Sequence, residues 1–228
     1  MTSLIENQAR LMLNLQARMN SKVDPLWVSK RFPYLRAVLI EAAEAIEHHG
    51  WKWWKKQACD MGQLQMEIID IWHFLLSEIL LRHEDDHDQA TAWLMQALAH
   101  SDADAAIPFD GESYELNGMS LVSKLELLIG LSAARRIDLA TFRSIMQDCE
   151  LNWDSLFRQY VSKNVLNFFR QDHGYKDGSY LKLWNGREDN EHLVELMQAL
   201  DASNPGYPEL LYQGLASRYP GQASPAPI

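Results

Sequence analysis

The stretch EIIDIWHFLL, residues 67–76, decides the fold class and marks a candidate site. It belongs to a segment from about Gln57 to Arg82 that is apolar almost all round, which is typical of a helix buried in a protein core. Asp70, His73 and Glu78 interrupt the apolar run, which is also too short to span a bilayer. We therefore expect a buried core helix and no membrane partner.

Helical periodicity continues on both sides of this segment. Apolar residues recur every three or four positions, which predicts helices over about 1–20, 34–49, 88–100, 119–134, 138–172 and 191–201. Residues 101–118 are expected to form a loop, and residues 174–190 show no periodicity. The sequence thus predicts an all-α fold, a single-domain helical bundle over residues 1–202. The proline-rich residues 203–228 are expected to form a C-terminal surface strap that ends in disorder.

Composition excludes several classes of function. The chain has 228 residues, with Lys+Arg 21 against Asp+Glu 31 and a net charge of −10. An acidic chain is not expected to bind nucleic acid, because such binding depends on many cations that neutralise phosphates. It can still hold a small anionic ligand on a local basic patch. The two cysteines form no CxxC pair and the N-terminus shows no signal peptide, so we expect a cytoplasmic protein.

Two carboxylate pairs form the first candidate site. Glu41 and Glu44 are three residues apart on one predicted helix, as are Glu67 and Asp70 on the apolar one. Such a pair shares a helix face, with Cβ atoms about 5–6 Å apart, and can bind one cation. A buried carboxylate such as Asp70 is costly unless it is paired or binds a metal. Oxygen ligands favour Mg²⁺, with Mn²⁺ as a second possibility, so we expect a four-helix metal-binding core.

A purely structural explanation of these acids stays open. The first pair, taken alone, is typical of a solvated helix face, and Lys52 or Lys55 could form a plain ion pair with one acid.

A basic segment rich in glycine and tyrosine complements the acids. Five cations, interleaved with aromatic residues, gather between residues 163 and 187 of an otherwise acidic chain: Lys163, Arg170, Lys176, Lys182 and Arg187. Polyphosphate bridged by Mg²⁺ requires cations and flexible backbone N–H donors of this kind. The alternative is a solvated loop whose charges complement the C-terminus of the preceding helix.

Aromatic and amide side chains offer the parts of a pocket for a flat base, which needs a stacking surface and a few fixed hydrogen bonds. The candidates are three tryptophans within residues 51–54, the pair His73 and Phe74, and the amides Gln16 and Asn20. Each also has an ordinary structural interpretation, since a tryptophan cluster is usually core or interface and a lone histidine is usually a hydrogen-bonded core residue.

Taken together, four segments resemble the dimeric all-α dUTPases, which belong to the MazG-like all-α NTP pyrophosphohydrolase superfamily. The segments are LNLQARMN (13–20), EAAEAIEHHGWKWWK (41–55), EIIDIWHFLL (67–76) and KNVLNFFRQDHGYKDGSYLKLWNGREDN (163–190). ExxE followed by ExxD marks the superfamily only. The WKWWK, DxWHF and NxFRQxxGYKxGxYxKxW patterns are much more specific to the dUTPase branch.

The resemblance implies a Mg²⁺-dependent homodimer that hydrolyses dUTP, and dUDP, to dUMP. This activity would limit uracil incorporation into DNA and supply dUMP. The implied metal ligands are Glu41, Glu44, Glu67 and Asp70, and Glu41 or Glu44 would also help deprotonate the attacking water. The implied uracil pocket contains Gln16, Asn20, Trp54, His73 and Phe74. Asn167 would face the sugar, and the phosphates would be held by Arg170, Tyr175, Lys176, Tyr180 and Lys182.

Three alternatives remain open at this point. A related pyrophosphohydrolase could act on another nucleotide such as dCTP. A ferritin-like di-iron bundle would use Glu-x-x-His pairs, of which only Asp70-x-x-His73 is a distant counterpart. A helical interaction protein without chemistry would carry the same acids as surface residues.

Overall fold

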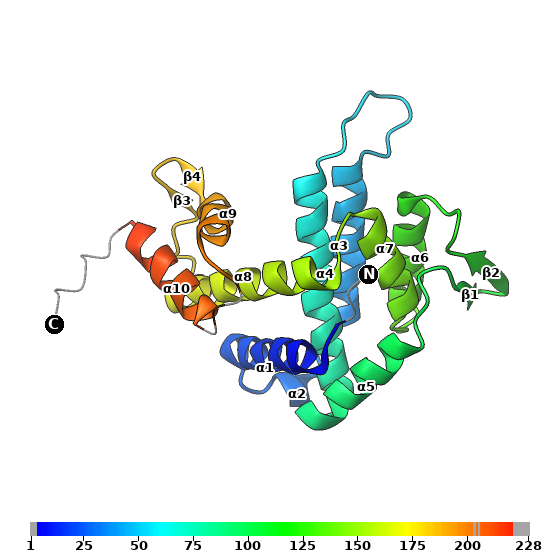
Figure 1. Ribbon diagram of the computed structural model, residues 1–228, viewed down its shortest axis with the longest axis horizontal. Helices are drawn as coiled ribbons and strands as arrows, with labels where there is room; N and C mark the ends of the chain where they lie inside the picture. Colours follow the sequence, from blue (N-terminus) through cyan, green and yellow to red (C-terminus); the bar gives the residue numbers. More distant parts are fainter. Residues whose placement is uncertain (1–3, 203, 205, 221–228) are drawn as a thin grey trace.

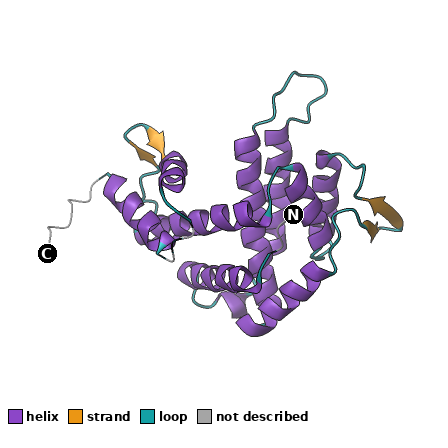
Figure 2. Cartoon of the chain, in the orientation of Figure 1, coloured by secondary structure: helices purple, strands orange, loops and turns teal. Residues whose placement is uncertain are grey.

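The computed structural model describes residues 4–202, 204 and 206–220 of the chain. The described part contains ten helices and four short strands (Figures 1 and 2). The helices are α1 (Glu6–Val23), α2 (Trp27–Lys30), α3 (Tyr34–His49), α4 (Met61–Arg82), α5 (His87–Ala99), α6 (Leu121–Ala133), α7 (Leu139–Asp148), α8 (Trp153–Asp172), α9 (Asp189–Ala199) and α10 (Tyr207–Arg218). The strands are β1 (Ala106–Phe109), β2 (Glu112–Glu115), β3 (Leu183–Trp184) and β4 (Arg187–Glu188). The predicted all-α fold is confirmed.

Helix α4 lies at the centre of the core, as its apolar sequence predicts. It begins after Asp60, whose side chain accepts a hydrogen bond from the backbone N–H of Gln63 and so caps the helix. Figure 1 shows α3 beside α4 and α8 crossing it, and α1 and α5 contact it as well. Trp72, fully buried in the middle of α4, stacks on Phe142 of α7 with ring centroids 5.0 Å apart. Among the described residues, none of the helices combines the length and apolar character that a bilayer crossing requires.

Helix α10 occupies the place where we expected a surface strap. It starts at Tyr207 with Pro208 in its first turn, where proline is tolerated because that N–H has no helical partner. Leu211 and Leu215 are fully buried and belong to the main core. The strap prediction is therefore wrong over α10, because apolar residues at helical spacing outweigh the prolines around them. The expected disorder over 221–228 lies outside the described residues, and the boundary after residue 202 stays a prediction.

Two β-hairpins interrupt segments that we expected to be irregular. Strands β1 and β2 pair antiparallel between residues 106 and 115, and β3 pairs with β4. Each hairpin closes over two residues with positive φ, Asp110-Gly111 (51° and 83°) and Asn185-Gly186 (53° and 81°). Asp-Gly and Asn-Gly are the residues that favour such two-residue turns. The loop prediction for 101–118 was wrong because the strands are too short to show a period of two.

The predicted helix over 138–172 is two helices. Helix α7 ends at Asp148, Glu150 has a positive φ of 58°, and α8 starts at Trp153. Asn152 caps α8 in a capping box, since it accepts from the N–H of Ser155 and its own N–H donates to the Ser155 hydroxyl. Periodicity misses this break because apolar residues continue through it, whereas the cap decides where α8 begins.

Replacing Asn152 with Ala is expected to lower the free energy of unfolding by about 1 kcal/mol, the usual cost of losing a helix cap. The measurement is the urea midpoint followed by circular dichroism. Asn152→Asp keeps a capping oxygen and serves as the control, so an equal loss in both variants would contradict the role of the cap.

Candidate active site

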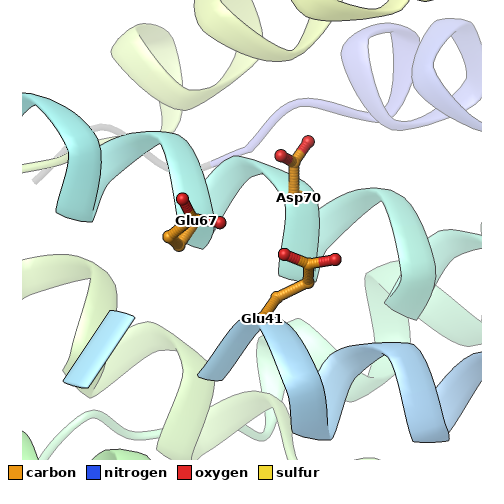
Figure 3. A group of neighbouring side chains, drawn as sticks. All are labelled: Glu41, Glu67 and Asp70. Carbon is orange, nitrogen blue, oxygen red and sulfur yellow. The ribbon is translucent and has the colours of Figure 1, made fainter. Parts of the chain in front are cut away.

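Three carboxylates converge between α3 and α4. Glu41 projects from α3 toward Glu67 and Asp70 of α4, which lie one turn apart (Figure 3). One oxygen of each group lies within 4.8 Å of those of the other two. Glu67 is buried, whereas Glu41 and Asp70 are partly exposed. We call these three residues the carboxylate cluster.

Glu44, the fourth predicted ligand, lies outside this cluster. It is exposed on α3, one turn after Glu41. Its charge still contributes to the raised pKa values of both Glu41 and Glu67.

The cluster retains protons near neutral pH. Burial, followed by the charge of Asp70, raises the pKa of Glu41 to about 8, and the same two causes raise the pKa of Glu67 to about 7. Crowded carboxylates disfavour one another's ionisation because like charges repel at short range. A divalent cation would replace these protons, and a set of oxygen ligands suits a hard ion such as Mg²⁺ or Mn²⁺.

The cation that pairs with the cluster comes from α8. Lys163 is 7% exposed, and its Nζ lies 3.1 Å from Oδ2 of Asp70. Our suggestion of Lys52 or Lys55 was wrong as to the residue, since Lys52 instead pairs with Glu47 at 2.8 Å. Lys163 lies far from Asp70 in sequence, so only the crossing of α8 over α4 brings the two together.

A cavity of about 450 Å³ adjoins the cluster, and we call it the central cavity. Many of the predicted site residues lie in its wall: Gln16, Asn20, Glu41, Asp70, His73, Phe74, Asn167, Arg170 and Tyr175. Helices α1, α3, α4 and α8 supply most of this wall, so the cavity lies among the packed helices.

A polar network in the cavity wall orients its amides. Gln16 Oε1 lies 2.8 Å from His73 Nδ1 and 2.9 Å from the Tyr160 hydroxyl, whose single proton can go to this oxygen or to the backbone oxygen of Met12, also 2.9 Å away. Gln16 Nε2 donates to Asn20 Oδ1 at 3.1 Å, and that oxygen also accepts from Ser77 at 3.2 Å. With His73 Nδ1 assigned as the donor, both amide oxygens act as acceptors, and this assignment orients both amides.

The network leaves one donor and one acceptor unused. Asn20 Nδ2 and His73 Nε2 are buried and have no hydrogen-bond partner among the described residues. Burial, with the charge of Lys163, lowers the pKa of His73 to about 3, so the ring is neutral. With Nδ1 donating to Gln16, Nε2 carries a lone pair. A ligand edge with an acceptor next to a donor would satisfy both groups.

A second, polar cavity of about 470 Å³ lies on the other side of the cluster, and we call it the outer cavity. Its wall includes Glu67, Lys182 and Asn190, and it shares Asp70 and Lys163 with the central cavity. Lys182 lies 3.5 Å from Glu188 and is exposed. The cluster therefore lies where the two cavities meet.

Two predicted phosphate ligands are held by an acid that the sequence analysis assigned no role. Arg170 forms two hydrogen bonds with the fully buried Asp189, and the Tyr180 hydroxyl donates to the same carboxylate. Burial alone would raise the pKa of Asp189, but its hydrogen bonds with Arg170 and Tyr180 keep that pKa below the ordinary value. Asp189 is thus ionised.

Two further predicted residues line neither cavity. Lys176 donates at 2.9 Å to the backbone oxygen of Val23, a residue of the central cavity wall. Trp54 is 59% exposed on the loop between α3 and α4, where its ring contacts Trp51 and Trp53. The structure does not bring either residue to the cluster.

Sequence reasoning named Lys163 among the candidate phosphate-binding cations but missed its pairing with Asp70. Lys163 precedes Asn167 by four residues and Arg170 by seven, a spacing that places all three on one face of α8. Tyr160 and Ser77 gave no such signal, because their contacts with Gln16 and Asn20 depend on the packing of separate helices.

Comparison with known protein families shows that residues 8–175 match the family described as dUTPase, which is more than half of the chain. The matched range contains the whole carboxylate cluster and every residue in the wall of the central cavity. No curated protein matches the chain.

The raised pKa of Glu41 predicts how stability depends on pH without metal. Between its ordinary pKa of 4.5 and about 8, the folded state retains a proton that the unfolded state has lost. Stability from this group is therefore present below pH 4.5 and is lost as the pH rises toward 8. Glu41→Gln imitates the protonated form, so its gain in Tm over the wild type should grow from pH 5 to pH 8 in EDTA.

Glu47→Gln is the matched control for this measurement. Hydrogen bonds from Lys52 and Trp51 lower the pKa of Glu47, so the control should show a constant difference in Tm from pH 5 to 8. A gain for Glu41→Gln that shrinks with rising pH would contradict the assignment.

Proposed function

The chain belongs to the dUTPase family and hydrolyses dUTP, and we propose that it does so with Mg²⁺ held by Glu41, Glu67 and Asp70. The observation that carries this proposal is the convergence of three carboxylates within 4.8 Å in the wall shared with the central cavity. When bound, Mg²⁺ polarises phosphoryl oxygens and lowers the pKa of water. Mn²⁺ fits the same oxygen ligands.

We assign proton transfer to Glu41 and Glu44. Glu41 faces the central cavity, and once a bound metal has displaced its proton, its carboxylate can accept a proton from the attacking water. Glu44 lies one turn further along α3, exposed and outside the cluster, and it would join the three ligands only if its side chain turned toward the metal.

The unused donor and acceptor belong to two residues in the wall of the central cavity, and their polarity matches the edge of uracil. Asn20 Nδ2 can donate to O4 of the base, and His73 Nε2 can accept from N3–H. Cytosine presents a donor and an acceptor in the opposite order, so it would leave both buried groups unpaired. Sites built on hydrogen bonds of this kind discriminate strongly for that reason. Phe74 in the cavity wall would exclude the methyl group of thymine by bulk.

The phosphates are proposed to extend along α8 toward the outer cavity. Asn167 would face the sugar, and Lys163 lies nearest to the cluster. Lys163 can turn to a phosphate oxygen when Asp70 serves as a metal ligand. The remaining contacts are assigned to Arg170, Tyr175, Lys176, Tyr180 and Lys182, which would offset charge on the leaving pyrophosphate. The same contacts would accept dUDP.

A ferritin-like di-iron site is disfavoured by the contacts of His73. Such a site uses Glu-x-x-His pairs, and the one similar pair here, Asp70 and His73, does not point both side chains at the cluster, because Nδ1 of His73 bonds to Gln16 and its ring lies against Tyr160. His48 Nε2 lies 3.5 Å from Glu67 but belongs to no such pair. His73 thus belongs to the proposed base pocket.

We propose a cytoplasmic homodimer. Cys59 and Cys149 are both free thiols, which suits a reducing compartment. Trp51, Trp53 and Trp54 are 38%, 86% and 59% exposed on one loop, and adjoining exposed aromatic surface is typical of a protein interface. Figure 1 shows this loop extending beyond the ends of α3 and α4.

The activity is tested by pyrophosphate release from dUTP, dCTP and dTTP and by phosphate release from dUDP, with Mg²⁺ or EDTA. Glu67→Gln and Asp70→Asn should each lower kcat/KM for dUTP by at least ~100-fold. Replacing a residue that only hydrogen-bonds to a metal ligand already costs about 10–100-fold in metal affinity or activity. Glu78→Gln on the same helix is the control and should retain turnover. Full activity in folded Glu67→Gln, or activity unaffected by EDTA, would overturn the metal assignment.

The dimer is tested by light scattering coupled to size exclusion. The wild type should elute with twice the chain mass of 26.3 kDa, and Trp53→Ser should weaken association by about tenfold or more, as for a buried aromatic anchor. Trp53→Phe should remain dimeric. A wild-type chain that elutes as a monomer at micromolar concentration would contradict the proposal.

A further inference from the structure

Helix α8 presents two cations to the central cavity, and each is paired with a different acid. Lys163 pairs with Asp70, a member of the carboxylate cluster, so its partner changes when the cluster binds metal. Arg170 pairs with Asp189, which lies outside the cluster at the start of α9. Nothing in the reaction is expected to release this second pair, so Arg170 stays held while Lys163 is free to turn.

The contacts of Asp189 occupy both of its oxygens. Arg170 Nε donates to Oδ2 at 2.8 Å, and Arg170 Nη2 donates to Oδ1 at 2.9 Å. The Tyr180 hydroxyl adds a bond to Oδ2 and the backbone N–H of Asn190 adds one to Oδ1, each at 2.8 Å. The carboxylate is fully buried and saturated, so it can hold the guanidinium but cannot itself contact substrate.

The outer part of the guanidinium remains available. Nη2 also lies 3.4 Å from the side-chain oxygen of Asn190, and Nη1 lies 3.3 Å from that of Asn167. A guanidinium has five N–H groups, so one N–H on Nη1 is left without an acceptor among the described residues. The two parallel hydrogen bonds to Asp189 fix the plane of the Arg170 guanidinium. The free N–H on Nη1 is therefore already oriented to bind an anion in the cavity.

We propose that Asp189 is a positioning residue that fixes Arg170 for phosphate binding, and that the segment following α10 supports this arrangement through Tyr219. The inference rests on the phosphate role proposed above for Arg170. Asp189 and Tyr219 both lie beyond residue 175, the end of the range that matches the family.

Tyr219 reaches Asp189 through Tyr180. The Tyr219 hydroxyl accepts a hydrogen bond from the backbone N–H of Leu181 at 3.0 Å. Its ring stacks on Tyr180, with centroids 5.4 Å apart and planes at 10°. It also packs edge-on against Phe169 and Trp184. The end of the C-terminal helix thus fixes the tyrosine whose hydroxyl bonds to Asp189.

The contacts of Tyr219 give α10, which is remote from the carboxylate cluster, a role in ordering the 174–190 segment. The segment 174–190 carries most of the proposed phosphate contacts, yet its two strands contribute only two residues each. Stacking on Tyr219 and the bond from Leu181 supply the order that so short a hairpin lacks.

The test compares binding of two probes by calorimetry in Mg²⁺: α,β-imido-dUTP, which carries phosphates, and deoxyuridine, which does not. Asp189→Asn should weaken binding of the imido nucleotide on the order of 10–100-fold, the range for losing hydrogen bonds to a charged group. Its affinity for deoxyuridine should stay within about twofold, because the base pocket does not contact Asp189. A merely structural role would weaken both probes alike.

Arg170→Ala separates this inference from the function on which it rests. If Asp189 acts through Arg170, the double variant should bind the imido nucleotide no more weakly than Arg170→Ala alone. Weak binding in Arg170→Ala with wild-type binding in Asp189→Asn would overturn the positioning role and leave the phosphate role intact. Wild-type binding in Arg170→Ala would overturn both.

A second pair of variants carries the test if Asp189→Asn fails to fold. Tyr219→Leu removes the stacking and the bond from Leu181, and Tyr212→Leu is the matched control from α10. Tyr212 also packs on Phe169, but its hydroxyl bonds to Asp172 rather than to the 174–190 segment. Tyr219→Leu should weaken binding of the imido nucleotide several-fold more than Tyr212→Leu does, and the affinity for deoxyuridine should not change. Equal effects of the two variants would overturn the role of Tyr219.

Discussion

Repulsion among Glu41, Glu67 and Asp70 is the constraint on which the site depends. Two like charges about 4 Å apart repel by about 4 kcal/mol at an effective dielectric of 20, and here three groups lie within 4.8 Å. The folded chain holds them in place because α3 and α4 pack along each other. Protons on Glu41 and Glu67 and the charge of Lys163 relieve the repulsion without metal. A divalent cation can do so more completely, which couples metal binding to proton release.

Helix α8 connects this cluster to the rest of the site. One of its faces is buried in the core through residues such as Leu166 and Phe169. Another places Lys163, Asn167 and Arg170 in the wall of the central cavity. Because both faces belong to one rigid helix, the packing that stabilises the fold also fixes the distance between the cluster and the proposed phosphate contacts. Asp70 holds Lys163 only until Asp70 binds metal, whereas Asp189 holds Arg170 throughout. We therefore expect Lys163 to move during the reaction and Arg170 to stay in place.

Much of the fold follows from local patterns in the sequence. The all-α class, the buried α4 helix and the boundaries of α3 come from periodicity that burial imposes. The pairing of carboxylates along α4 follows from helical spacing alone. The errors lie where local signals are weak or conflict: the four-residue strands β1 and β2 are too short to show a period of two, the prolines around α10 concealed a helix, and apolar residues hid the break before Trp153.

The sequence by itself determined which groups are present: paired carboxylates on two helices, an amide pair on α1, and cations on one face of α8. Only the tertiary structure decided which of these groups meet. It left Glu44 outside the cluster, paired Asp70 with Lys163 and Arg170 with Asp189, and placed Trp54 away from the cavity. The reason is that spacing within a helix fixes only the neighbours on its own face, whereas contacts between distant segments depend on how whole helices pack.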